Sequence, residues 1–210
     1  MGNFKMKVTI IAGAPGQDVR FLKDNVDRNS FIIAADSGYL NCVSAGIVPD
    51  LIIGDFDSSK RPETSASIMQ FPSVKNDTDT FCCIKEAVKR GADAVEIFCA
   101  LGGRADHTLS NIVNLEYCLR NNIPASIISE KSVLSLHKTA FSLEKSNFKF
   151  FSLFALGGPV QGLCIRGAAY ELDHFTLSPF DSIGQSNEFK NSTVNIDFVS
   201  GVLLLVLSND

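Results

Sequence analysis

The first half of the chain alternates short apolar runs with stretches of helical periodicity. Apolar runs of strand length lie at residues 7–12, 31–35, 51–53, 95–101 and 125–129, with a further candidate at 68–71. Segments with the apolar spacing of helices follow them: from Asp18 onward, over 39–45, over 80–90 and from about 104 to 121. Strands that alternate with helices predict a mostly parallel sheet with helices on both faces.

The pattern changes after about residue 133. Short strand-like runs then follow one another at 133–137, 141–143, 148–156, 163–165, 170–172, 193–198 and 202–207. Gly, Pro, Asn, Asp and Ser separate them, and the apolar spacing of helices is absent. Closely spaced short strands predict an all-β domain. We therefore expect an α/β catalytic domain over residues 1–132, followed by a small all-β sandwich over residues 133–210.

Composition narrows the class of protein. The net charge of −4 over 210 residues argues against general nucleic-acid binding, which needs a basic face. It is compatible with a small anionic ligand, because a metal ion reverses the local charge. The N-terminal apolar run is short, and the run 202–207 is too short to span a bilayer. We expect a cytoplasmic protein with neither a membrane nor a nucleic acid as partner.

The six cysteines predict small buried side chains. None of them forms a C-x-x-C pair, and most stand in apolar surroundings. We interpret them as hydrophobic residues in a reducing compartment, and we expect neither a zinc site nor a disulfide framework.

Acidic residues gather where the predicted strands end. Asp36 follows the second strand, Asp55 and Asp57 follow the third, Asp106 follows the strand that ends at residue 101, and Asp79 precedes a helix. Ligands of an open parallel sheet bind beyond the carboxyl ends of its strands. If the chain stays extended through Asp57, then Asp55 and Asp57 point to the same side. Carboxylates in this number predict a Mg²⁺ site that bridges to substrate phosphates.

Groups suited to phosphate accompany these acids. Glycines after the strands, such as Gly102 and Gly103, let the backbone approach an anion, and helix N-termini favour negative charge. Arg104 offers a planar fork to phosphate oxygens, and Lys75 adds a second positive charge. The chain lacks G-x-x-x-x-G-K-[ST], which excludes a P-loop enzyme. The combination predicts a metal–nucleotide phosphate site.

Acids near the predicted helix starts also have a simpler interpretation when each is taken alone. Asp77 and Asp106 are good helix N-cap residues, and for each of them capping is the more frequent role. The convergence of several acids, glycines and basic residues is more specific than any one of them.

The order of these motifs resembles that of bacterial thiamine pyrophosphokinases. The residues that carry the resemblance are Asp36-Ser37-Gly38, Pro49-Asp50, Gly54-Asp55-Phe56-Asp57-Ser58, Lys75 with Thr78-Asp79, Gly102-Gly103-Arg104 with Asp106-His107 and Asn111, and Gly184 with Ser186-Asn187-Glu188-Phe189 and Gly201. One position departs from the pattern: Asn76 stands where the family often has an acid. Asp77 is its neighbour.

The resemblance implies a homodimeric enzyme that transfers the diphosphate of Mg-ATP to the hydroxyl of thiamine and releases AMP. The catalytic residues implied are Asp55, Asp57, Asp79, Arg104 and Asp106. The metal ligands implied are Asp36, Asp55, Asp57 and Asp79. The residues implied in substrate binding are Asp36, Lys75, Thr78, Gly102, Gly103, Arg104 and His107, with Ser186 and Asn187 contacting thiamine from the sandwich domain.

Three alternatives remain at this point. The first is a diphosphokinase of similar architecture that acts on a pterin alcohol. The second is a non-catalytic module that binds a nucleotide or thiamine. The third is a scaffold in which the acids serve only as helix caps. The segment 186–189 favours thiamine, and the presence of all five acids favours catalysis.

Overall fold

The structure is a computed structural model that describes residues 6–56, 64–72 and 76–209. The chain divides into two compact units, residues 1–130 and residues 131–210. The predicted fold class is confirmed, because the first unit has a parallel sheet with helices and the second is an antiparallel β-sandwich. Among the described residues, no helix combines the length and the apolar character that a membrane crossing requires.

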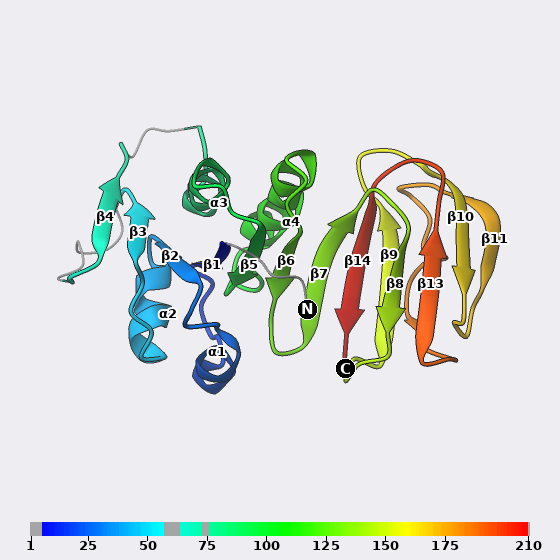
Figure 1. Ribbon diagram of the computed structural model, residues 1–210, viewed down its shortest axis with the longest axis horizontal. Coiled ribbons are helices and arrows are strands. Elements are labelled where there is room, and N and C mark those ends of the chain that lie inside the picture. The colour runs from blue at the N-terminus through cyan, green and yellow to red at the C-terminus, as the bar shows by residue number, and fades with distance from the viewer. Residues whose placement is uncertain (1–5, 57–63, 73–75, 210) are drawn as a thin grey trace. The chain divides into compact units, whose positions relative to one another are not determined.

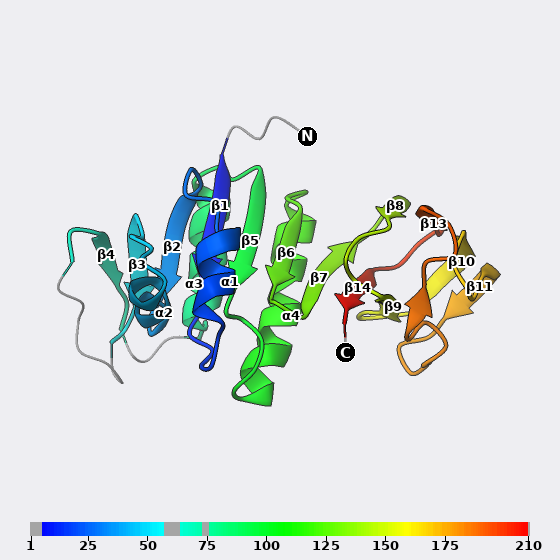
Figure 2. The same cartoon turned by 90° about the horizontal axis from the view of Figure 1, so that it is seen from below.

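Parallel strands form the centre of the first unit. In its described part they are β1 (Lys7–Ile11), β2 (Phe31–Ala35), β3 (Leu51–Gly54), β4 (Ser67–Gln70), β5 (Ala94–Phe98) and β6 (Ala125–Ile128). Within this unit they pair in the order β6-β5-β1-β2-β3-β4, which Figure 2 shows. The carboxyl end of β1 therefore lies between those of β2 and β5.

Helices cover both faces of this sheet. They are α1 (Val19–Asn25), α2 (Gly38–Ser44), α3 (Asp79–Lys89) and α4 (Ala105–Arg120). Figure 1 shows α1 and α2 on one side of the strands and α3 and α4 on the other. Burial on both faces explains the apolar runs without alternation, such as Val8–Ile11, in which every residue is buried.

The predicted caps at Asp77 and Asp106 are wrong. Thr78 caps α3, because its side chain accepts a hydrogen bond from the Phe81 N–H at 3.2 Å. The Asp77 carboxylate instead accepts a hydrogen bond from Lys85 Nζ at 2.7 Å. Asp106 lies inside the first turn of α4, one residue beyond the helix start.

The condition under which Asp55 and Asp57 would point to the same side, an extended chain through Phe56, is not met. The strand β3 ends at Gly54, and Phe56 has a φ of 55°, in the left-handed region. The alternation argument therefore fails at Phe56. Asp57 itself lies outside the described residues.

The second unit contains two antiparallel sheets. Its described strands are β7 (Ser132–His137), β8 (Phe141–Glu144), β9 (Phe150–Ala155), β10 (Val160–Arg166), β11 (Leu172–Leu177), β12 (Asn187–Glu188), β13 (Thr193–Asp197) and β14 (Leu203–Ser208). Within this unit they form the arrays β12-β9-β14-β7 and β11-β10-β13-β8. Phe151 and Leu205 from the first array pack with Leu163 and Ile196 from the second in one buried core.

Strand boundaries in the second unit differ from the sequence prediction at three places. The strand expected at 170–172 is displaced to β11, and Tyr170 is 69% exposed. The strand expected at 163–165 extends over all of β10, and the short β12 was not predicted. The cause at β11 is an irregular register against β10, which breaks the apolar alternation that identifies a strand.

Candidate active site

A pocket of about 660 Å³ lies at the carboxyl ends of strands in the first unit. Its walls come from the loops that follow β1, β2, β3 and β5, together with the beginnings of α3 and α4. This is the edge at which an open parallel sheet binds ligands.

Acidic side chains from three loops line this pocket. Among the described residues they are Asp36 after β2, Asp55 after β3, and Asp77 and Asp79 at the start of α3. The structure thus brings together Asp36, Asp55 and Asp79, as the sequence predicts. The sequence interpretation missed Asp77 because it assigned the residue to capping. Its position two residues before Asp79 was the signal that could have identified it.

Close backbone packing fixes the loops that carry these acids. A Cβ atom at Gly54 would lie 3.0 Å from both the Cα and the Oδ1 of Asp36. The Asp36 N–H donates to the Ile53 carbonyl at 2.7 Å, and Asp36 has a φ of 43°. Only glycine leaves room for this approach. The end of β3 therefore holds Asp36 in place.

The loop after β1 also lies close to the loop after β2. A Cβ at Gly13 would lie 2.1 Å from Ser37 Oγ. The Asn41 side chain joins the same loops, because its Nδ2 donates to the Ala12 carbonyl at 3.0 Å. The turns after β1 and β2 are therefore packed against each other at the pocket wall.

Arg104 is held by a two-point ion pair with Asp106. Arg104 Nε lies 3.1 Å from Asp106 Oδ1, and Nη2 lies 2.6 Å from Oδ2, although both side chains are largely exposed. Hydrogen bonding to the Arg104 guanidinium lowers the pKa of Asp106 to about 2, and the carboxylate raises the pKa of Arg104. Arg104 and His107 line the pocket, whereas Asp106 is not among its lining residues. Asp106 therefore contacts Arg104 and is not itself part of the pocket wall.

The remaining walls offer backbone donors. Gly102 and Gly103 line the pocket with φ values of 92° and 69°. The N-terminal ends of α3 and α4 also border it, with Thr78 at the cap of α3. Unpaired N–H groups and the helix dipole make such ends favourable for anions.

Two further lining residues support the loop after β5. Asn111 is 7% exposed, and its Nδ2 donates to the Ala100 carbonyl at 2.8 Å. Cys99 has a φ of 55°, and burial raises the pKa of its thiol to about 12. The sequence pattern included Asn111 without giving it a role. Its amide holds the backbone from which Gly102 and Gly103 follow.

Besides Asp106, four predicted site residues are not placed among the residues that line this pocket. Asp57 and Lys75 lie outside the described residues. Ser186 and Asn187 belong to the second unit. Asn187 is 4% exposed, and its side chain forms hydrogen bonds with the backbone of Tyr170. Its Nδ2 donates to the Tyr170 carbonyl at 2.7 Å, and its Oδ1 accepts from the Tyr170 N–H at 3.0 Å. The predicted contact of Asn187 with thiamine stays a prediction.

Comparison with known families decides the classification. Residues 22–127 match the model of the thiamin pyrophosphokinase catalytic domain, and residues 138–203 match that of the thiamin pyrophosphokinase vitamin B1 binding domain. The chain belongs to the thiamine pyrophosphokinase family. The resemblance inferred from the motifs is therefore confirmed, and so is the prediction of an enzyme of this family. The two matched segments fall one in each compact unit.

Individual members of the family match this chain over nearly its whole length. A thiamine pyrophosphokinase of Bacillus subtilis (strain 168) is 28% identical over 211 residues, which cover 97% of this chain and 99% of the relative. The crystal structure of thiamine pyrophosphokinase from Bacillus subtilis matches with a TM-score of 0.89 at 26% identity, covering 97% and 99% of the two chains. Thiamin pyrophosphokinase from Candida albicans shares the fold, with a TM-score of 0.78 at 18% identity and coverages of 98% and 89%.

Proposed function

We propose that this protein transfers the diphosphate group of Mg-ATP to the hydroxyl of thiamine, giving thiamine diphosphate and AMP. The observation that carries the proposal is the pocket of the first unit, where carboxylates from three loops meet glycine turns and the starts of two helices. The chain also carries the matched catalytic and vitamin B1 binding domains of the family.

The acids of the pocket fit a magnesium ion. Carboxylate oxygens are the ligands that this hard cation prefers, and it commonly binds through one or two of them plus substrate phosphates. We assign the metal to Asp36, Asp55 and Asp79, with Asp57 as the remaining ligand predicted from the sequence. When bound, Mg²⁺ offsets the charge of the triphosphate and polarises a phosphoryl oxygen.

The other lining groups are suited to hold the triphosphate. Gly102 and Gly103 allow phosphate oxygens to approach the backbone, and the N-terminus of α4 begins directly after Arg104. Arg104 supplies a positive charge at the rim, and its two-point ion pair with Asp106 orients the guanidinium. We assign Lys75 a similar charge-compensating role, and we assign Thr78 and His107 to substrate binding.

The second substrate is assigned to the second unit. We propose that Ser186 and Asn187 contact thiamine, since they lie in the segment matched to the vitamin B1 binding domain. The reaction requires the thiamine hydroxyl to face the β-phosphorus of ATP, in line with the bond to the leaving AMP. Positioning of two bound substrates is the main contribution required of the protein.

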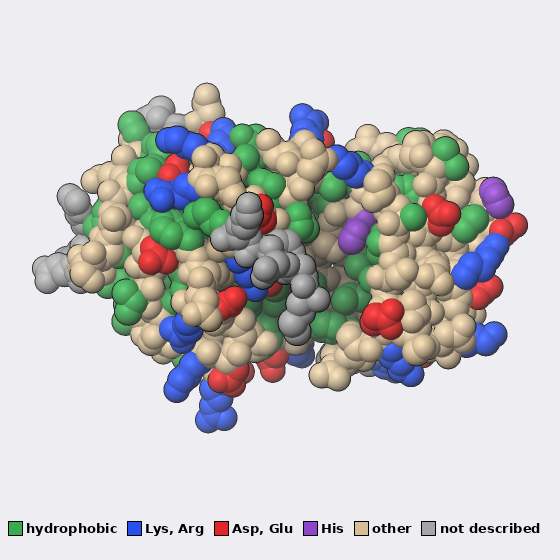
Figure 3. All heavy atoms as spheres, in the orientation of Figure 1, with side chains coloured by type: hydrophobic (Ala, Val, Ile, Leu, Met, Phe, Trp, Pro, Cys, Tyr) green, Lys and Arg blue, Asp and Glu red, His purple; other side chains and the backbone are tan. Residues whose placement is uncertain are grey.

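We further propose that the protein works as a homodimer in the cytoplasm, without nucleic acid or membrane as partner. All six cysteines, each within the described residues, are free thiols, which suits a reducing compartment. On the face drawn in Figure 3, acidic and basic side chains are interspersed among the described residues. A nucleic-acid surface would instead concentrate positive charge.

The proposal is tested by product analysis. The purified protein is incubated with ATP, Mg²⁺ and thiamine, and the nucleotides and thiamine phosphates are separated by chromatography. We expect AMP and thiamine diphosphate in equal amounts, both of them dependent on thiamine and abolished by EDTA. ADP as the product, or nucleotide turnover that is independent of thiamine, would contradict the proposal. A parallel reaction with a pterin alcohol tests the alternative acceptor.

A further inference from the structure

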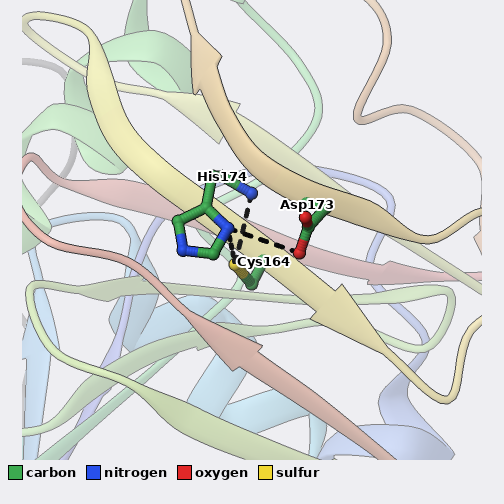
Figure 4. A group of neighbouring side chains, drawn as sticks. All are labelled: Cys164, Asp173 and His174. Carbon is green, nitrogen blue, oxygen red and sulfur yellow. Dashed lines mark hydrogen bonds and ion pairs between the residues drawn. The ribbon is translucent and has the colours of Figure 1, made fainter.

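A cluster of three different metal-ligand side chains lies in the second unit, apart from the residues that line the pocket. The Sγ of Cys164, a carboxylate oxygen of Asp173 and a ring nitrogen of His174 all lie within 4.8 Å of one another. Figure 4 shows the Asp173 and His174 side chains converging on Cys164. The sequence interpretation of every cysteine as a buried apolar residue does not hold here, because Cys164 is only half-buried.

An irregularity between two strands creates this cluster. Along residues 163–165 of β10, the partner strand β11 contributes one residue more than β10 does. Cys164 therefore opposes both Asp173 and His174. Adjacent side chains of a regular strand point to opposite faces, but a bulge can place both on one face. His174 has a φ of 46°, which marks the point at which the strand departs from extended geometry.

The distances suit a tetrahedral ion. Cys164 Sγ lies 3.8 Å from His174 Nδ1, and His174 Nδ1 lies 3.4 Å from Asp173 Oδ1. Around a tetrahedral Zn²⁺ with ordinary bond lengths, a sulfur and a nitrogen ligand lie about 3.6 Å apart, and a nitrogen and an oxygen about 3.3 Å apart. We propose that Cys164, Asp173 and His174 bind Zn²⁺ on the outer face of this sheet.

The neighbouring strand offers a fourth ligand. Asp197 of β13 is the direct cross-strand partner of Cys164, and it is exposed. Paired residues of adjacent strands point to the same face with their Cβ atoms about 5 Å apart. A rotation of the Asp197 side chain can therefore bring its carboxylate to the ion, and a water molecule can take the same position. Mixed sulfur, nitrogen and oxygen donors favour Zn²⁺ over Mg²⁺.

Arg166 opposes the ion at this site. Its Nη2 contacts Asp173 Oδ1, and its Nη1 donates to the Leu172 carbonyl at 2.5 Å. The guanidinium places a positive charge beside the proposed cation and occupies one oxygen of a ligand. Removal of that charge should therefore strengthen metal binding, whereas removal of a simple structural ion pair would have no such effect.

Cobalt provides a direct probe of the thiolate ligand. The full-length protein is freed of metal with a chelator and titrated with Co²⁺, which gives a sulfur-to-metal charge-transfer band only when a thiolate coordinates it. We expect one equivalent of Co²⁺ to produce this band and Zn²⁺ to displace it. Cys164→Ser should abolish the band, while Cys82→Ser, which changes another half-buried thiol, should retain it. Absence of the band in the unmodified protein, or its persistence in Cys164→Ser, would overturn the proposal.

Two further variants test the rest of the ligand set by competition with a chromophoric zinc chelator. His174→Asn removes the ring nitrogen and keeps a residue that tolerates positive φ, so Zn²⁺ affinity should fall at least about tenfold. Arg166→Gln should raise the affinity by a few-fold. Circular dichroism confirms that each variant is folded. Unchanged affinity in His174→Asn, or unchanged or weaker affinity in folded Arg166→Gln, would overturn the assignment.

Discussion

The two units of this chain place their polar side chains in different ways. In the first unit, Asp36, Asp55 and Asp79 come from separate loops and line one pocket. In the second unit, Asn187 is buried, and its amide is engaged by the backbone of Tyr170. Parallel strands bring all their carboxyl ends to one edge, whereas antiparallel strands distribute their loops between two ends. A parallel sheet therefore gathers functional residues that an antiparallel sheet scatters.

The largest expected effect comes from breaking the acid cluster of the first unit. Asp55→Asn keeps the shape of the side chain and removes its charge. We expect turnover to fall at least about 100-fold, because the variant lacks a carboxylate that we assign to the metal, and with it the stabilisation of the transition state by that metal. Circular dichroism and the melting temperature should stay close to those of the unmodified protein. The matched control is Asp24→Asn on the exposed side of α1, which should retain full activity. Equal activity in both variants would contradict the assignment.

The next effect tests the packing that positions this cluster. In Gly54→Ala, the added methyl group would meet the Cα of Asp36 at 3.0 Å. We expect a loss of about 3 kcal/mol in the free energy of unfolding, or a displaced Asp36 with a raised KM for Mg-ATP. Chemical denaturation and steady-state kinetics measure the two outcomes. Gly158→Ala in the second unit has open space around the new Cβ and should leave both quantities unchanged.

A smaller effect is expected from the buried amide of the second unit. Asn187→Ala leaves the N–H and C=O groups of Tyr170 without their partner. We expect the free energy of unfolding to fall by about 2 kcal/mol, since each of the two hydrogen bonds to the Tyr170 backbone contributes about 1 kcal/mol. Asn195→Ala on the exposed face of β13 should cost much less. An unchanged melting temperature for Asn187→Ala would show that the amide is not structural and would strengthen its assignment to thiamine.

The smallest effect concerns acid stability. Burial lowers the pKa of His137 from its ordinary 6.5 to about 4. Between these two values the unfolded chain binds the proton and the folded chain does not, so the free energy of unfolding falls as the pH decreases from 6.5 toward 4. We expect a loss of about 2 kcal/mol between pH 6.5 and 4.5.

The ion pair of the first unit should respond at a lower pH. The pKa of Asp106 is lowered to about 2 by Arg104, so its contribution to folding is lost only as the pH falls below the ordinary carboxyl range toward 2.

Urea titrations from pH 7 to pH 4 measure the His137 effect, and His137→Phe should remove it. A stability profile that is identical in His137→Phe would contradict the buried, neutral imidazole.

The sequence predicts the first unit better than the second. The uninterrupted apolar runs identify the buried strands, and Asp36, Asp55 and Asp79 follow from the topology alone. Asp77 was missed because local rules favour it as a cap, whereas in the structure Lys85 pairs with its carboxylate and Thr78 supplies the cap. That outcome depends on which side chain reaches the first-turn N–H groups.

In the second unit, the sequence predicts the sandwich but not its irregular strands. The extra residue at Asp173 and His174 interrupts the alternation of β11, so the strand could not be located by period. The two-residue strand β12 is too short for any periodicity, and its position depends on pairing with β9. The local sequence pattern does not predict long-range strand pairing of this kind.

The fate of the β-phosphorus of ATP tests the central claim most directly. The protein is supplied with Mg²⁺, thiamine and ATP labelled at the β-phosphorus, and the label is followed into the separated products. The account predicts that all transferred label appears in thiamine diphosphate and that the released AMP carries none. Label retained in ADP, with thiamine monophosphate as the second product, would show transfer of a single phosphoryl group and would contradict the account.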